Sequence, residues 1–319
     1  MEKYDVVALG ELLIDLTQNG YSGQGNPLLE ANPGGAPCNV LALLTKLGHS
    51  TAFIGKVGKD GFGDQLENAL TETGISTAGL LRDDQVHTTL AVVHTLAGGD
   101  RHFSFYRNPG ADMCLHTQEI NRELIRQARI FHFGTLSMTD EPVRSATYAA
   151  IAEAEAHGVL RSFDPNLRPP LWRTLDEAKE QVLYGMAHCD ILKISDNEIQ
   201  WLTQQEDFDA GVRWIRQRFP NIRLLLLSMG KDGSRGYSGD AMAEVKGFSV
   251  PAIETTGAGD TFFGGILHHV LAWGLRDYTR QELEEMLTFA NAAAALVTTR
   301  KGALRVMPSL AEIQALRNA

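Results

Sequence analysis

The stretch "IETTGAGDTFFGG" (residues 253–265) places a Gly-Ala-Gly segment directly before Asp260, at the start of an apolar run that predicts a helix over 260–273. Small residues at a helix N-terminus let an anion contact backbone N–H groups, and the helix dipole adds partial positive charge there. Such a site would stabilise a phosphoryl group during its transfer. Asp260 itself has two interpretations: an ordinary residue of a helix first turn, or a base that accepts the proton of an attacking hydroxyl.

The bulk composition is that of an acidic globular protein. Of 319 residues, 44% are apolar and 21% are charged, and the formal net charge is −10. Because there is no Lys/Arg-rich stretch, we expect neither nucleic acid nor a membrane surface as a partner. The three cysteines are far apart and lack metal-ligand spacing, and the N-terminal segment indicates a first core strand, not a signal peptide. We therefore expect a cytoplasmic protein.

Short runs rich in Leu and β-branched residues alternate with helical patterns along the chain. The predicted strands are 5–10, 51–58, 129–134, 158–164, 190–195, 222–230 and 244–253. The predicted helices include 37–47, 62–73, 139–157, 207–219 and 260–273. This alternation predicts an α/β fold, with a mostly parallel sheet covered by helices on both faces and functional residues at the carboxyl ends of its strands.

One region departs from this alternation. Residues 88–96 and 101–107 have the pattern of two antiparallel strands joined by a Gly-Gly turn. We expect this hairpin to form a small sheet that projects from the main body, paired with the polar, Gly-rich residues 11–30. Strands from about 11–30 and 88–108 would then serve as a lid over a site, as a dimer surface, or as both.

Several motifs place polar side chains beside glycine or proline. In "NPGGAPCNVLALLTKLG" (32–48), Asn39 falls in the first turn of a predicted helix, and its carboxamide can both donate to and accept from a sugar hydroxyl. The alternative is a plain helix entry. In "RSFDPNLRPPLW" (161–172), Asp164 and Arg168 belong to a rigid loop after a strand, which indicates either a binding site or a proline-stiffened connection.

Two further motifs follow predicted strands. In "LKISDNEI" (192–199), Ser195 and Glu198 have the spacing of a capping box, while the carboxylate could also hold Mg²⁺ through water. In "LLLLSMGKDGSRGY" (224–237), the glycines would let backbone N–H groups approach a diphosphate. The segment "GKVGKDGFG" (55–63) lacks the Walker A spacing, and no GxGxxG, HRD or DFG motif is present, which excludes P-loop, dinucleotide-binding and protein-kinase interpretations.

Taken in order, "GELLIDL", residues 33–42, "GKVGKDGFG", "DPNLRPPLW", "ETTGAGDTFFGG" and "RKGALRVMP" resemble the motifs of the PfkB (ribokinase-like) sugar kinases over essentially the whole chain. "FYRNPGAD" (105–112) together with "DPNLRPPLW" is most similar to the fructokinases. The resemblance implies one ribokinase-like domain over residues 1–319, with three layers, a mostly parallel sheet and a small β-sheet lid.

The resemblance also implies roles for individual residues. Asp260 matches the catalytic base, next to an anion hole made by Gly257, Ala258 and Gly259. The expected sugar-binding residues are Asp15, Gly34, Gly35, Asn39, Arg107 (from the lid), Asp164 and Arg168. The expected nucleotide-binding residues are Lys193, Ser228, Gly230, Gly233, Thr256 and Asn291, although the Ala-rich segment around the last of these could equally make an ordinary tight helix contact.

Two positions depart from the family pattern. Glu254 replaces the usual Asp before Thr-Thr, a position associated with a monovalent cation, so K⁺ activation is a weaker expectation than Mg·ATP. Ser195 replaces the Asn of the Asn-x-x-Glu element but leaves Glu198 available to Mg²⁺ through water.

The expected activity is transfer of the γ-phosphoryl group of Mg·ATP to the 6-hydroxyl of D-fructose, by a homodimer joined through the lid. The nearest alternative is 2-keto-3-deoxygluconate, whose carboxylate would need a cation such as Arg107 or Arg168, or another PfkB acceptor such as a nucleoside. A non-catalytic sugar-binding protein on the same fold is a second alternative.

Overall fold

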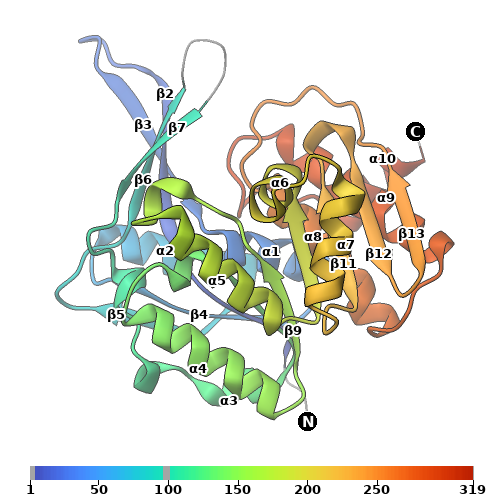
Figure 1. Ribbon diagram of the computed structural model, residues 1–319. Helices are drawn as coiled ribbons and strands as arrows, with labels where there is room; N and C mark the ends of the chain where they lie inside the picture. The colour runs from blue at the N-terminus through green and yellow to red at the C-terminus, as the bar shows by residue number, and fades with distance from the viewer. Residues whose placement is uncertain (1–3, 96–100, 319) are drawn as a thin grey trace.

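The computed structural model describes residues 4–95 and 101–318, and the larger of its two sheets is built from short apolar strands (Figure 1). Within these residues the sheet has the order β13-β12-β11-β10-β9-β8-β1-β4-β5. Neighbouring strands are parallel except where β12 pairs with β11 and β13. The strands are β1 (Tyr4–Leu9), β4 (Thr51–Gly58), β5 (Ser76–Asp83), β8 (Ala128–Gly134), β9 (Leu160–Asp164), β10 (Ile191–Ser195), β11 (Leu224–Ser228), β12 (Ser234–Ser238) and β13 (Ala241–Val245).

Helices cover both faces of this sheet, as predicted. In β1, Val6 and Ala8 pack on one face while Val7 and Leu9 pack on the other, because successive side chains of a strand point to opposite sides. The first face is covered by α1 (Ala36–Lys46), α2 (Gly61–Thr73), α8 (Ala258–Trp273), α9 (Arg280–Thr298) and α10 (Leu310–Arg317). The second is covered by α3 (Arg122–Arg126), α4 (Val143–Ala156), α5 (Leu175–Ala187), α6 (Asp196–Thr203) and α7 (Phe208–Arg218).

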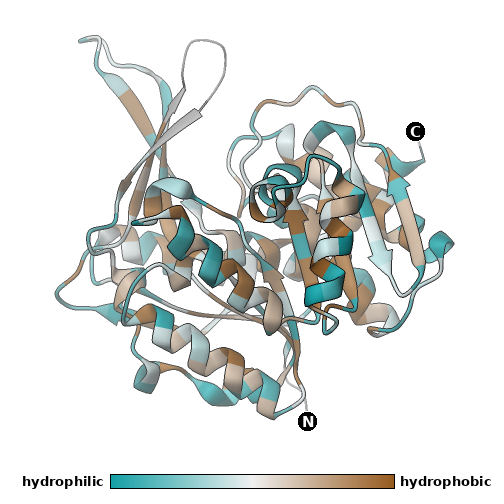
Figure 2. Ribbon diagram, viewed as in Figure 1, coloured by the Kyte–Doolittle hydropathy of each residue, from teal (hydrophilic) through white to brown (hydrophobic). Residues whose placement is uncertain are grey.

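Hydropathy follows the layers. The strands of the larger sheet are mostly apolar, and the helices on it carry polar residues toward the outside (Figure 2). No helix in the described part of the chain has the length and apolar character that a membrane span requires.

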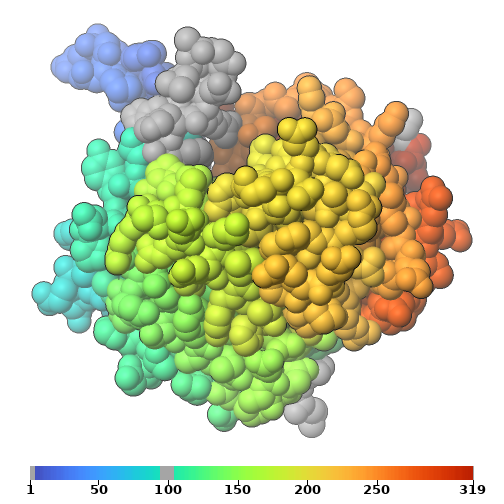
Figure 3. Space-filling view, in the orientation of Figure 1, coloured from blue at the N-terminus to red at the C-terminus, as the bar shows by residue number. Residues whose placement is uncertain are grey.

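A second, smaller sheet projects from one edge of the body, in agreement with the small sheet that was expected there. Its strands are β2 (Leu13–Tyr21), β3 (Pro27–Gly34), β6 (Leu90–Thr95) and β7 (Arg101–Tyr106), in the order β3-β2-β6-β7. Asp15 lies opposite Ala91, which confirms that the segment 11–30 pairs with the predicted hairpin. The Gly-Gly turn of that hairpin lies outside the described residues. In the space-filling view the end of this sheet formed by β2 and β3, drawn in blue, stands clear of the body (Figure 3).

The prediction of a strand over 244–253 is wrong. The strand β13 ends at Val245, and the following residues are irregular. Pro251 lacks the backbone N–H that strand pairing needs. A Cβ on Gly247 would lie 2.4 Å from the carbonyl oxygen of Lys231, so the backbone of this loop packs closely against the backbone of Lys231. The strand β12 was not predicted, because "SRGYS" carries little apolar signal.

Phe263 provides a test of the core between the sheet and α8. Its side chain is fully buried and lies edge-on to His132, with ring centroids 5.3 Å apart. Phe263→Ala should lower the free energy of unfolding by about 3–5 kcal/mol, because it leaves a cavity in a close-packed core. Urea unfolding measures this. The control Leu175→Ala, at an exposed site, should change the value by at most about 0.5 kcal/mol. A loss below about 1 kcal/mol for Phe263→Ala would contradict this packing.

Candidate active site

Two cavities meet at the N-terminus of α8. The first, of about 570 Å³, we call the Asp260 cavity. Its walls include Glu11, Asp15, Gly35, Asn39, Phe105, Leu136, Asn166, Arg168, Lys193 and residues 252–260. The second, of about 740 Å³, we call the Asn291 cavity. Its walls include Ser195, Ser228, Gly230, Lys231, Gly233, Phe248, Val250, Asn291, Ala294 and Ala295. Lys193, Ala258 and Gly259 line both, so a group bound in one cavity would contact a group bound in the other.

The start of α8 is shaped by its glycines. Gly257 is the N-cap, with φ 77°, and a Cβ there would lie 2.7 Å from the Cβ of Ala303. A residue with a side chain would be strained at this position. No side chain caps this helix end. The first N–H groups of a helix lack partners within the helix, so this segment can bind an anion.

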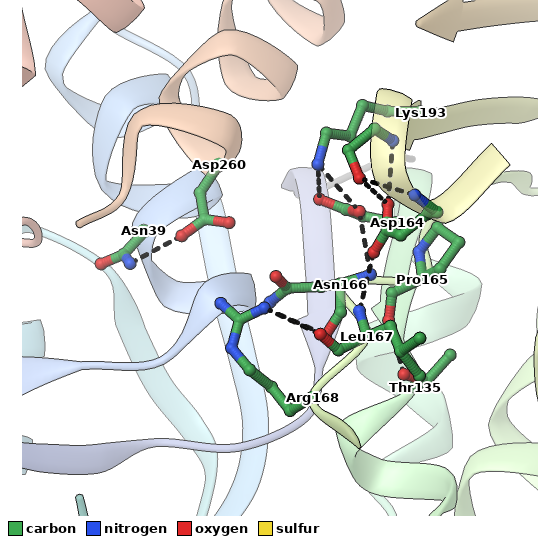
Figure 4. Close-up of polar contacts among 11 residues, drawn as sticks. Asn39, Thr135, Asp164, Pro165, Asn166, Leu167, Arg168, Lys193 and Asp260 are labelled. Carbon is green, nitrogen blue, oxygen red and sulfur yellow. Dashed lines mark hydrogen bonds and ion pairs between the residues drawn. The ribbon is translucent and has the colours of Figure 1, made fainter. Parts of the chain in front are cut away.

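Asp260 lies in the first turn of α8, but its side chain does not cap the helix. The carboxylate is 8% exposed and accepts a hydrogen bond from Nδ2 of Asn39 at 2.8 Å (Figure 4). Burial raises the pKa of Asp260 above its ordinary value, while Asn39, Lys193 and Arg168 act in the opposite direction. Oδ1 of Asn39 is buried and has no hydrogen-bond partner among the described residues, which leaves it able to accept from a ligand hydroxyl.

Lys193 forms a buried ion pair beside this carboxylate. Its Nζ lies 2.9 and 3.1 Å from the two carboxylate oxygens of Asp164, at the carboxyl end of β9 (Figure 4). Burial raises the pKa of Asp164 to about 6; Lys193 lowers it, and the neighbouring charges of Glu198 and Asp260 raise it. The site therefore gathers three carboxylates around one ammonium group.

Glu198 forms the capping box that its spacing predicts. One carboxylate oxygen accepts from the backbone N–H and the hydroxyl of Ser195, at 2.8 and 2.7 Å, and the other accepts from the N–H of Leu167 at 2.7 Å. Burial would raise the pKa of Glu198, but Lys193 and these donors hold it below its ordinary value. Because both oxygens are already hydrogen-bonded, this carboxylate fits a hydrated Mg²⁺ held through water, not a directly bound ion.

The predicted site residues separate into three groups. Those that line the Asp260 cavity are Asp15, Gly35, Asn39, Arg168, Lys193, Thr256, Gly257, Ala258, Gly259 and Asp260. Those that line the Asn291 cavity are Ser228, Gly230, Gly233 and Asn291, together with Lys193, Ala258 and Gly259. Those that lie behind the walls are Gly34, Arg107, Asp164 and Glu198.

Four of these positions differ from their expected roles. Asp164, expected among the sugar-binding residues, lies behind the walls, where its carboxylate is paired with Lys193. Thr256, expected on the nucleotide side, lines the Asp260 cavity, where its hydroxyl donates to Glu254 at 2.7 Å. Gly34 makes room for Asp15, since a Cβ on it would lie 2.4 Å from a carboxylate oxygen of that residue. Arg107 does not reach the cavity: its guanidinium is paired with Asp112, with Nε 2.7 Å from Oδ2.

Asn166, from the loop 161–172 that was expected to form a binding site, also lines the Asp260 cavity, together with Glu11 and Phe105, which were not predicted to belong to the site. Glu11 follows the first strand, and one of its carboxylate oxygens accepts from the N–H of Ala36 at 2.8 Å. Burial raises the pKa of this carboxyl to about 7. Its position just after the carboxyl end of β1 was the available signal, because binding residues of parallel sheets gather there.

The model of the "pfkB family carbohydrate kinase" family matches residues 3–310. The chain belongs to this family. It is 41% identical to fructokinase-2 of Oryza sativa subsp. japonica over 313 residues, which cover 98% of this chain and 93% of that protein.

Two solved structures extend the likeness to the fold. The fructokinase of Xylella fastidiosa with bound ATP has a TM-score of 0.90 at 31% identity, with 100% of this chain and 99% of that one covered. A double mutant of the Vibrio cholerae O395 fructokinase, in a form with fructose, ADP and potassium ion bound, has a TM-score of 0.87 at 31% identity, with 99% of each chain covered. The chain is a carbohydrate kinase of the fructokinase type.

Lys193→Met tests the buried cluster through the pH dependence of stability. Without the ammonium group, the pKa of Asp164 should rise further above its unfolded value. An acid with a raised folded pKa costs stability once the pH exceeds its unfolded pKa, so the deficit relative to wild type should grow as the pH rises. We expect a deficit of about 3–5 kcal/mol near pH 8 and a smaller one near pH 5, measured by urea unfolding.

The matched control is Lys59→Met, which breaks an exposed pair with Asp84 and should change stability by less than about 1 kcal/mol. An equal deficit for Lys193→Met at both pH values would show that charge burial is not the cause.

Proposed function

We propose that this protein transfers the γ-phosphoryl group of ATP to the 6-hydroxyl of D-fructose, giving fructose 6-phosphate. The observation that carries the proposal is the junction of the two cavities at residues 257–260, where an anion-binding helix end adjoins a buried carboxylate. The fructokinase relatives support fructose as the acceptor.

The acceptor sugar would lie in the Asp260 cavity. Asp15 and Asn39 offer hydrogen bonds to its hydroxyls, and Gly35 lets the sugar approach the backbone. Asp260 is the base that accepts the proton of the attacking hydroxyl as the bond to phosphorus forms. Its burial favours this role, because a raised pKa makes the carboxylate a stronger base.

The nucleotide would lie in the Asn291 cavity, with its phosphates toward α8. The backbone N–H groups of Gly257, Ala258 and Gly259 stabilise charge on the transferring group, and Lys193 adds a positive charge at the junction. Glu198 would hold Mg²⁺ through water, and the ion would neutralise phosphate charge.

A monovalent cation and a cytoplasmic location complete the proposal. The Vibrio cholerae structure with bound potassium ion supports a K⁺ site beside the loop of Glu254, whose carboxylate also accepts from the N–H of Gly302 at 3.0 Å. The buried free thiols of Cys38 and Cys189 fit a reducing compartment.

The small sheet would act as a lid that excludes water from the reaction. Asp15 in β2 and Phe105 in β7 both line the Asp260 cavity, so movement of this sheet would open or close the acceptor site. Excluding water favours transfer to the sugar over hydrolysis of ATP.

The second candidate acceptor is 2-keto-3-deoxygluconate. Arg168 lines the Asp260 cavity and offers a cation to a carboxylate. Its guanidinium also lowers the pKa of Asp260, which places it near the reacting groups.

Asp260→Asn tests the assignment of the base. The amide keeps the shape of the side chain but cannot accept the proton, so kcat should fall by about 10²–10⁴-fold. Steady-state kinetics measures this loss, and calorimetry should find fructose and ATP binding close to wild type. The control Asp240→Asn makes the same change at an exposed position. Turnover close to wild type in Asp260→Asn would exclude this residue as the base.

We also propose a homodimer joined through the small sheet. Tyr21, Leu28, Leu29 and Tyr106 expose 68%, 48%, 47% and 67% of their surface there, which is unusual for apolar side chains gathered on one sheet. A charge in the middle of such an interface is costly to bury. Leu29→Lys should therefore shift the protein from dimer to monomer in analytical ultracentrifugation, whereas Leu175→Lys, equally exposed elsewhere, should not. A monomeric wild type would overturn the proposal.

A further inference from the structure

Arg107 is a buried cation with every side-chain nitrogen engaged. It follows the end of β7, and its side chain is 2% exposed. Nε donates to Oδ2 of Asp112 at 2.7 Å, Nη1 donates to the hydroxyl of Thr139 at 3.0 Å, and Nη2 donates to the carbonyl of Leu136 at 2.9 Å. The guanidinium is therefore fixed in one orientation, and its charge is neutralised by a carboxylate that is equally buried.

Asp112 is held as firmly as its partner. It lies in the short 3₁₀ helix η1 (Ala111–Cys114), and its Oδ1 accepts a hydrogen bond from the hydroxyl of Thr89, just before β6. The pair thus lies at the base of the small sheet, between the strand end that carries Arg107 and the strand start that carries Thr89.

This ion pair lies directly behind the wall of the Asp260 cavity. Leu136, whose carbonyl accepts from Arg107, lines the cavity. Glu11 also lines it, and the pKa of its carboxyl responds to both charges: Asp112 raises it and Arg107 lowers it. Nη2 of Arg107 lies 2.9 Å from the carbonyl oxygen of a residue in the cavity wall, which is close enough for its charge to act on a ligand, and the paired charge of Asp112 opposes it.

The other charges around the Asp260 cavity, apart from this ion pair, disfavour an anionic sugar. Asp15 and Asp260 are acids in the walls of the cavity, and the cations Lys193 and Arg168 both act on the reacting Asp260. Arg107 would be a further cation beside the acceptor, if Asp112 did not neutralise it.

We propose that Asp112 is a specificity-determining residue, which pairs with Arg107 and so keeps the acceptor cavity selective for neutral sugars against sugar acids. The proposal rests on the function proposed above and deepens it, because it assigns the choice between fructose and a carboxylate-bearing acceptor to one ion pair outside the cavity wall.

Glu11 is the group that could take over the role of Asp112. Its carboxyl has a pKa of about 7 because it is buried, and the charge of Asp112 also raises this pKa. The other titratable group that interacts with Glu11 is the thiol of Cys38, whose pKa is raised well above its ordinary value and which is therefore neutral. Because Asp112→Asn removes a charge that raises the pKa of Glu11, the substrate ratio is measured at several pH values between about 5.5 and 7.5, and the part of the change that is the same at each pH is assigned to Asp112.

The experiment compares kcat/KM for 2-keto-3-deoxygluconate with kcat/KM for fructose. Asp112→Asn keeps the shape of the side chain but removes its charge, leaving the cation of Arg107 unbalanced behind the cavity wall. The ratio should then rise by about tenfold. A tenfold change corresponds to about 1.4 kcal/mol, the order of magnitude expected when one unbalanced charge behind the wall attracts the carboxylate of the substrate. Arg107→Gln, which leaves the acid unbalanced instead, should lower the ratio.

The double variant Arg107→Gln/Asp112→Asn removes both charges and should return the ratio to near the wild-type value. Asp84→Asn, at an exposed pair with Lys59, is the matched control and should leave the ratio unchanged. Because Arg107→Gln and Asp112→Asn move the ratio in opposite directions, either one tests the proposal if the other fails to fold.

An equal loss of kcat/KM for both substrates in Asp112→Asn would mean that the ion pair only supports the fold, and this result would overturn the proposal. A raised kcat/KM ratio that persists in the double variant would also overturn the proposal, because Arg107 would then not be the source of the change. A wild type that prefers 2-keto-3-deoxygluconate to fructose would instead contradict the proposed function.

Discussion

The hydrogen bond from Asn39 to Asp260, at 2.8 Å, is the contact on which the site depends. It joins side chains that are 221 residues apart in the chain, one from the start of α1 and one from the start of α8. Both helices pack on the same face of the sheet, in one hydrophobic cluster. The bond holds the carboxylate of Asp260 at the wall of the Asp260 cavity, and Ala258 and Gly259 of the same helix end line the Asn291 cavity. The packing of α1 against α8 in the core therefore also sets the position of Asn39 relative to the proposed base.

Much of the fold could be predicted from the sequence, because the parallel strands are short apolar runs that need no distant information to be recognised. β1, β4, β8, β10 and the capping box at the start of α6 all follow from local patterns. The segment 244–253 could not be assigned in this way. Its apolar residues resemble a strand, but they form an irregular loop whose Phe248 and Val250 line the Asn291 cavity.

The backbone of the candidate site could be predicted where a sequence motif determines its conformation. The partner of a side chain could be predicted less well, because it depends on the tertiary fold. Gly257–Asp260 is determined by its own sequence, since the helix start needs a glycine with positive φ. Arg107 is different: its guanidinium binds Asp112, Thr139 and Leu136, whose positions depend on the tertiary fold. Glu11 was missed although its position after the first strand was a signal, because the sequence does not show that its side chain is buried and lines the same cavity as Asn39.

The most direct test of this account is the reaction of the wild-type protein with Mg·ATP and fructose, followed by ³¹P NMR and an assay of ADP. The account predicts one phosphosugar for each ADP released, with the phosphoryl group on the 6-hydroxyl, because that hydroxyl would face Asp260 at the junction of the two cavities. Release of ADP without phosphorylation of the sugar, or phosphorylation of a different hydroxyl, would contradict it.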